Sequence, residues 1–181
     1  VFSEVESLSQ SHGMRYLMAA DGLWMEVSND WLHARVRIAP FTGHGKLPAG
    51  TLDTLISFAW KRVPKLVLDD FIEEARRALP NEAAAVVMWD ADSGEFSLVM
   101  AGSNATPAQT EIHRPKPTGS QRLVMDIHSH GSGHAYFSPT DDADDRGEIK
   151  IAVVVGEVDK PVASVAARLC ICGHFEPLFA L

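Results

Sequence analysis

An apolar segment that ends in two closely spaced histidines constrains this chain more than any other stretch. The run 123–127 predicts a short buried strand, and His128 and His130 follow directly. Residues i and i+2 of a strand point to the same side, so both imidazoles should face one point. Ser138 and the proline after it have the pattern of a helix start. Such a start would return the carboxylate of Asp141 to the mouth of the strand.

These side chains predict a metal site. Two imidazoles and one carboxylate are a common ligand set for catalytic zinc, with a fourth position left for water. The candidate ligands are His128, His130 and Asp141. A plainer interpretation stays open at this point, because Ser138 and Asp141 also form the pattern of a capping box. The acids that follow are expected to favour the helix dipole and to carry no chemistry: Asp142, Asp144 and Asp145.

Composition limits the class of protein. The chain has 181 residues, of which 46% are hydrophobic, and a net charge of −8. This length suits one domain, or one domain with a small addition. The acidic balance argues against direct binding of nucleic acid, which needs a cationic surplus. Because no apolar run could cross a bilayer and Cys170 and Cys172 are expected to be reduced, a cytoplasmic protein without membrane contact is expected.

The first third of the chain is expected to be a β-rich subdomain over residues 1–62. Alternating apolar residues predict an antiparallel meander over three segments: 15–19, 23–27 and 31–38. His33 and Arg35 alternate away from the apolar side of this meander and are expected to face solvent. The segment 51–62 has apolar residues at helical spacing, which permits a short helix there.

Residues 63–181 are expected to form an α/β domain. Apolar spacing predicts an amphipathic helix over 65–79 that ends at Pro80. Residues 102–119 contain several prolines and glycines and are expected to form a long loop, with room for a short strand near Ile112. The remaining pattern predicts strands over 83–89, 95–100, 123–130, 149–155 and 162–172.

The spacing His-x-His, seven residues, Ser, two residues, Asp resembles the signature of the JAMM (JAB1/MPN/Mov34) metalloproteases, and all four positions match. That family also carries a glutamate after its first helix, at the start of a strand. Here the expected helix is followed by Pro-x-Glu and a small, apolar strand, which makes Glu82 the candidate. The resemblance implies an MPN/JAB-type α/β sandwich, similar to cytidine deaminases, with an N-terminal antiparallel β extension.

The same resemblance implies a zinc-dependent isopeptidase or peptidase. His128, His130 and Asp141 would hold Zn²⁺, Glu82 would activate a water bound to the zinc, and Ser138 would donate to the oxyanion. In the family this chemistry cleaves the bond that follows the C-terminal tail of ubiquitin or a ubiquitin-like protein. The alternative is a non-catalytic MPN-type scaffold that binds a ubiquitin-like or E1-like partner.

A wider resemblance covers most of the chain. The segments 20–23, 31–33, 126–131 and 137–145, together with Pro-x-Glu-Ala-Ala, are similar to the PRTRC system protein A family. Members are bacterial proteins encoded with an E1/ThiF-like protein, a ubiquitin-like protein and a ParB-like protein. The resemblance implies a bacterial ubiquitin-like protein or its conjugates as substrate, and an E1/ThiF-like protein as a further partner.

Two positions depart from the JAMM pattern or add to it. Many members have proline where this chain has Gly131, which loosens the loop after the histidines. Asp126 places an acid two residues before His128, on the same face of the strand. Two roles stay open for Asp126: it orients a ligand histidine, or it competes for the metal.

A zinc deaminase is disfavoured, because its His-x-Glu and Pro-Cys-x-x-Cys motifs do not occur.

Overall fold

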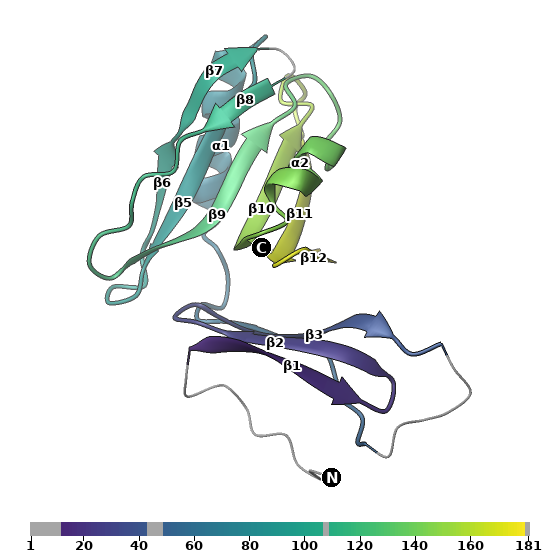
Figure 1. Cartoon of the computed structure of the whole chain (residues 1–181). Coiled ribbons are helices and arrows are strands. Elements are labelled where there is room, and N and C mark those ends of the chain that lie inside the picture. Colours follow the sequence, from purple (N-terminus) through teal and green to yellow (C-terminus); the bar gives the residue numbers. More distant parts are fainter. Residues whose placement is uncertain (1–11, 43–48, 107–108, 180–181) are drawn as a thin grey trace. The chain divides into compact units, whose positions relative to one another are not determined.

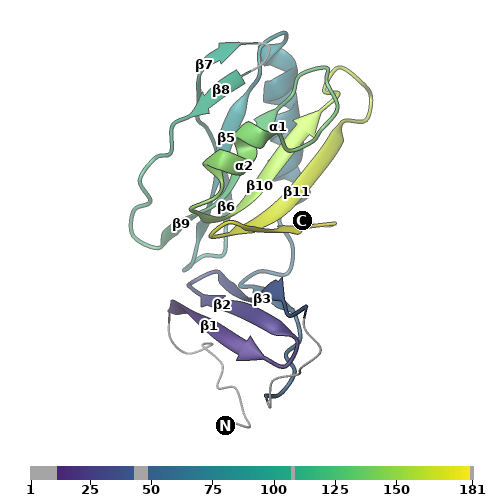
Figure 2. The same ribbon diagram turned by 45° about the vertical axis from the view of Figure 1, so that its right-hand side comes forward.

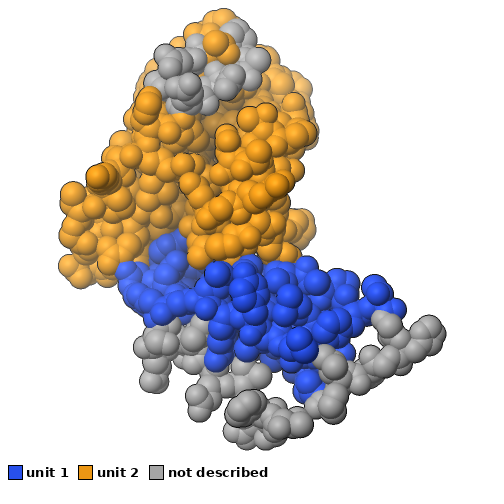
Figure 3. Space-filling model, in the orientation of Figure 1, with its two compact units in different colours: residues 1–61 blue, residues 62–181 orange. Residues whose placement is uncertain are grey.

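The computed structural model describes residues 12–42, 49–106 and 109–179, and divides into two compact units. Unit 1 is Val1–Lys61 and unit 2 is Arg62–Leu181 (Figures 1 and 3). Unit 1 is built of strands, whereas unit 2 combines a sheet with helices, so the α/β class predicted from sequence is confirmed. Neither helix of the described chain has the length and apolar character needed to span a bilayer.

Unit 1 contains a four-stranded antiparallel sheet in the order β1-β2-β3-β4. Its strands are β1 (Gly13–Ala19), β2 (Gly22–Ser28), β3 (Leu32–Pro40) and β4 (Leu55–Phe58). The three predicted strands are confirmed, but the helix permitted over 51–62 is wrong. Leu32 pairs with Phe58 across β3 and β4, and the Phe58 ring stacks against Trp31 and Trp60. This pairing outweighs a helical spacing that is weak on its own.

The face of this sheet that was expected to meet solvent instead surrounds a buried carboxylate. Glu26 is fully buried, and its Oε1 accepts from Arg35 Nη2 at 2.9 Å and contacts His33 Nε2 at 3.0 Å. Arg15 Nε donates to Oε2 at 2.7 Å. The solvent-facing prediction for His33 and Arg35 is therefore wrong. A buried carboxylate needs partners, and the neighbouring strands supply them.

Unit 2 is organised around a six-stranded sheet in the order β12-β11-β10-β9-β5-β6. β9 and β10 are parallel, and the other neighbours are antiparallel. Helix α1 lies on one face of this sheet and α2 on the other (Figures 1 and 2). The elements are α1 (Lys65–Ala78), β5 (Ala84–Asp90), β6 (Phe96–Met100), β9 (Gln121–Ser129), α2 (Pro139–Asp144), β10 (Ile149–Gly156), β11 (Ser164–Ile171) and β12 (His174–Pro177).

The sheet of unit 2 buries both apolar and charged side chains. Phe71 and Ala75 of α1 are fully buried, as are Val124, Val153 and their neighbours in the central strands. Buried charged residues also lie within this sheet: Asp126 on β9, Lys150 on β10 and Arg168 on β11. Burial of the apolar side chains stabilises the unit, whereas each buried charge costs free energy unless it is paired with an opposite charge.

The long loop predicted over 102–119 is wrong in its first half, although the short strand for which the prediction left room near Ile112 is confirmed. β7 (Gly102–Thr106) and β8 (Gln109–Ile112) pair as an antiparallel hairpin, and residues 107–108 of the predicted loop lie outside the described residues. Residues 113–118, which contain both later prolines, are irregular as predicted. The backbone of Thr106 accepts a hydrogen bond from Glu82 N at 2.9 Å, so the hairpin borders the segment that carries the candidate glutamate.

Candidate metal centre

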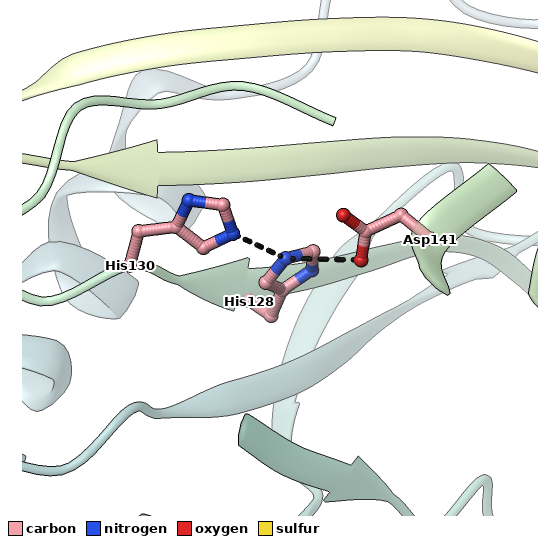
Figure 4. A group of neighbouring side chains, drawn as sticks. All are labelled: His128, His130 and Asp141. Atoms are coloured by element: carbon pink, nitrogen blue, oxygen red, sulfur yellow. Dashed lines mark hydrogen bonds and ion pairs between the residues drawn. The ribbon is translucent and has the colours of Figure 1, made fainter. Parts of the chain in front are cut away.

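The two histidines converge where β9 ends. His128 is the penultimate residue of β9, and His130 follows the last one. Their Nε2 atoms lie 3.3 Å apart, and their rings are tilted by 47° (Figure 4). The i, i+2 spacing on a strand accounts for this arrangement, because the intervening residue faces the opposite side.

Asp141 reaches the histidines from α2, and the N-terminal cap of that helix orients its carboxylate. Ser138 is the N-cap: its Oγ accepts from Asp141 N at 3.3 Å, and its backbone N donates to Asp141 Oδ2 at 2.6 Å. The other carboxylate oxygen, Oδ1, lies 3.4 Å from His128 Nε2 (Figure 4). The capping box and the ligand arrangement therefore coexist, with one oxygen of Asp141 serving each.

The spacing of these donor atoms fits a zinc ion. One ligand atom from each of His128, His130 and Asp141 lies within 4.8 Å of the other two. Ligand atoms about 2.0–2.1 Å from a tetrahedral zinc ion are separated by roughly 3.3–3.4 Å. The two separations given above, 3.3 Å and 3.4 Å, match that value. The donor set also has the chemistry of catalytic zinc sites, with imidazole nitrogens and a carboxylate oxygen.

Both imidazoles are held in forms that suit a metal ligand. His130 Nδ1 lies 3.3 Å from the backbone oxygen of His134, so a proton on Nδ1 leaves the Nε2 lone pair facing the centre. Burial lowers the pKa of His128 below its ordinary value, although the charge of Asp141 opposes this shift. A neutral imidazole is the form that binds a metal. The rings of Tyr136 and His130 pack in a T-shaped arrangement, with centroids 4.7 Å apart.

Glu82 lines the same cavity as the three candidate ligands. The cavity has a volume of about 800 Å³, and Ser138 also lines it. Glu82 is 8% exposed, and burial, followed by the negative charge of Asp141, raises its pKa to about 7. The carboxyl group is therefore poised to gain or lose a proton near neutral pH.

A serine that the sequence interpretation passed over fixes the segment carrying Glu82. Ser129 is fully buried between the two histidines, and its Oγ accepts from Ala83 N at 2.8 Å. Ser129 N donates to the Ala83 oxygen at 2.9 Å. These bonds join the residue after Glu82 to the end of β9. The alternation of the strand turns Ser129 toward the interior, but it does not identify Ala83 as the hydrogen-bond partner.

Asp126 takes neither of the two roles left open for it. Its Oδ2 accepts from Lys150 Nζ at 2.6 Å and from Arg114 Nε at 3.0 Å. Among the described residues it does not belong to the ligand group, and no hydrogen bond joins it to His128. In the sequence, Lys150 interrupts an otherwise apolar strand. Because a buried lysine is almost always paired, this position could have indicated a buried ion pair with an acid such as Asp126.

The unit that holds this site matches a known protein family. Residues 64–170 match the family model for prokaryotic homologs of the JAB domain. The chain belongs to this family. The JAB match contains the candidate ligands, Glu82 and Ser138. Residues 1–59 match a domain of unknown function, DUF2016, which is consistent with a PRTRC-type protein.

Comparison with other proteins adds little to the JAB assignment. A similar solved structure is the solution structure of protein DSY2949 from Desulfitobacterium hafniense, with 12% sequence identity and a TM-score of 0.42. The similarity covers 65% of the JAB chain and 88% of DSY2949. A likeness at this level supports no conclusion about function. No curated protein matches the chain.

Proposed function

We propose that this JAB protein is a zinc-dependent peptidase or isopeptidase that cleaves after the C-terminal tail of a ubiquitin-like protein. The observation that carries the proposal is the convergence of three ligand atoms in a cavity shared with Glu82: His128 Nε2 lies 3.3 Å from His130 Nε2 and 3.4 Å from Asp141 Oδ1. Family membership supports the coarser statement, a metal-dependent peptidase or a scaffold. The donor set favours the peptidase, because a scaffold has no need of intact ligands.

His128, His130 and Asp141 would hold the ion. When bound, zinc supplies Lewis acidity, which polarises a substrate carbonyl and makes water in the open coordination position more acidic. Glu82 supplies the proton transfer. With its pKa near 7, the Glu82 carboxylate accepts a proton from the attacking water and then returns it to the departing amine.

Ser138 is the proposed donor to the oxyanion that forms on the substrate. Its Oγ accepts the N–H of Asp141, which uses a lone pair and leaves its own O–H free to donate. One such donor contributes on the order of 3 kcal/mol to transition-state stabilisation. The cap also prevents Ser138 from turning away, so a single interaction positions both the helix and the donor.

The substrate and partner assignments rest on the sequence resemblance. We propose a bacterial ubiquitin-like protein or its conjugates as substrate and an E1/ThiF-like protein as a further partner. The N-terminal DUF2016 match supports a PRTRC-type protein, in which these partners would be encoded together. The deaminase-like layer arrangement and a cytoplasmic location stay predictions from the sequence.

Cleavage of an extended ubiquitin-like protein tests the proposal. The zinc-loaded full chain is incubated with a ubiquitin-like protein that carries extra residues after its tail, and products are identified by mass spectrometry. The wild type should cleave at the end of the tail, whereas Glu82→Gln should bind zinc and release no product. A zinc-loaded wild type that is inert on every peptide and isopeptide linkage would favour the scaffold instead.

A further inference from the structure

Helix α2 carries a proposed metal ligand, yet an apolar core does not hold it in place. The helix has six residues, and none of its side chains is buried. A helix this short is unstable by itself, because its few hydrogen bonds cannot offset the entropy lost in forming it. Other interactions must therefore hold Asp141 against the end of β9.

A buried arginine on β11 contacts α2 and the residues that flank it. The Arg168 side chain is 7% exposed. Its Nη1 donates to Asp142 in the middle of α2, and its Nη2 donates to Asp145, the C-cap of α2, at 2.7 Å. The guanidinium also lies 3.9 Å from the ring centroids of Phe137, which precedes the N-cap, and Phe175 on β12. One planar group therefore contacts the residues on either side of Asp141.

A lysine links the same helix to the strand that carries the first histidine. Lys150 Nζ contacts Asp145 Oδ1 at 2.8 Å and Asp126 Oδ2 at 2.6 Å. Asp126 precedes His128 by two residues on β9. The ion pairs thus form a continuous path from α2 to β9, between the two elements that supply His128 and Asp141.

We propose that Arg168 is a positioning residue for the metal centre. The arginine clamp, defined as Arg168 with Asp142, Asp145, Phe137 and Phe175, holds α2 so that Asp141 Oδ1 faces His128. This inference rests on the proposed zinc site, but it does not depend on whether the protein is a peptidase. Lysine could not replace arginine in the clamp, because its ammonium group offers neither the forked pair of donors nor a planar group that packs against the two phenylalanine rings.

Loss of Arg168 has two effects of opposite sign on metal binding. Removal of a positive charge near a cation site strengthens the attraction for the cation through space. Removal of the clamp frees Asp141 and weakens the site. The sign of the change in zinc affinity therefore separates a positioning role from a purely electrostatic one.

Zinc affinity of the full-length Arg168→Met variant is the test, measured by competition with a chromophoric chelator. We expect binding at least about 10-fold weaker than in the wild type, the usual scale for residues that orient ligands. With Co²⁺ in place of Zn²⁺, the intense visible bands of a tetrahedral site should weaken. Binding as tight as in the wild type, or tighter, would overturn the proposal.

Arg35→Met is the matched control, because Arg35 pairs with the buried Glu26 in unit 1. It removes a partly buried cation, also paired with a buried carboxylate, outside the metal unit and should leave zinc affinity unchanged. An equal loss of affinity in Arg35→Met would mean that any loss of a buried ion pair has this effect, and would also overturn the proposal.

A second pair of variants serves if Arg168→Met does not fold. Asp142 is half-exposed and belongs to the clamp, whereas Asp144 lies on the same helix, lines the cavity and takes no part in the clamp. Asp142→Asn should weaken zinc binding more than Asp144→Asn, although each removes one negative charge. Equal effects would overturn the clamp.

A wild type that binds no zinc would defeat the proposed function and this inference together, whereas zinc binding without an effect at Arg168 would defeat the inference alone.

Discussion

At the scale of single residues, the proposed site assigns two interactions each to Asp141 and Ser138. Asp141 caps its helix with one oxygen and faces His128 with the other. Ser138 accepts in the cap and keeps a proton to donate. Glu82 has no such division, and its burial gives it an unusual pKa. Spacing along a strand and in a helix cap fixes direction, so it predicted the placement of Asp141 and Ser138, whereas Glu82 was predicted only from the family resemblance.

The raised pKa of Glu82 makes stability of the metal-free protein depend on pH. Its pKa is about 7 in the folded chain against an ordinary 4.5, so the folded state favours the protonated form. Protonated Glu82 therefore contributes to the free energy of unfolding. This contribution is fully present below pH 4.5 and is lost as pH rises through 7, and it amounts to roughly 1.4 kcal/mol for each unit of difference between the two pKa values. Urea unfolding in chelator should show Glu82→Gln gaining stability relative to the wild type between these pH values. A difference that stays constant with pH would contradict the assignment.

Ser138→Ala should lose both the cap and the oxyanion donor. We expect unfolding to become easier by about 1 kcal/mol, the usual cost of an N-cap. The value of kcat should fall by about 10²–10³-fold, as on loss of an oxyanion donor. Ser138→Thr keeps a hydroxyl and should retain most of both properties. An alanine variant with unchanged kcat would show that the hydroxyl does not act on the substrate.

At the scale of elements, three segments must meet for the site to form: the end of β9, the start of α2 and the turn before β5. The sequence predicted each element, since apolar periodicity and helix-start signals are local. The sequence did not reveal which contacts hold the three segments together. Ser129 bonds to the segment after Glu82, and Arg168 holds α2, across sequence separations of 46 and 26 residues. Contacts at such distances depend on register, which periodicity alone does not set.

Ser129→Ala should separate catalysis from metal binding. It removes the acceptor for Ala83 N and leaves a buried N–H without its partner, at a cost of about 1–3 kcal/mol. Because this loosens Glu82 and none of the three ligands, kcat should fall while zinc affinity stays the same. Ser120→Ala is the matched control, since it removes a hydrogen bond to Asp90 at the other end of β5. Equal losses of kcat in both variants would count against the assigned role of Ser129.

At the scale of the whole molecule, the chemistry is concentrated in one of two compact units. The candidate ligands, Glu82 and Ser138 belong to unit 2, Arg62–Leu181. Unit 1 has its own sheet and its own buried ion cluster around Glu26. The sequence predicted this β-rich N-terminal region and a short strand near Ile112, but it missed β4 and β7. These short strands exist through pairing with neighbours, which local sequence does not encode.

This concentration of the ligands predicts that unit 2 binds metal without unit 1. A fragment of residues 62–181 should bind one zinc ion with the affinity of the full chain, as measured by chelator competition. Every proposed ligand and the arginine clamp lie within it. Loss of zinc binding in a folded fragment would show that unit 1 contributes to the site.

The zinc content of purified protein tests the central claim most directly. After saturation with Zn²⁺ and extensive dialysis, elemental analysis should find one zinc ion per wild-type chain and almost none in His128→Ala or Asp141→Ala, with all three proteins folded by circular dichroism. Glu82→Gln should retain the metal, because Glu82 is not a proposed ligand. Equal zinc content in the wild type and both ligand variants, or no zinc in any of them, would contradict the metal centre described here.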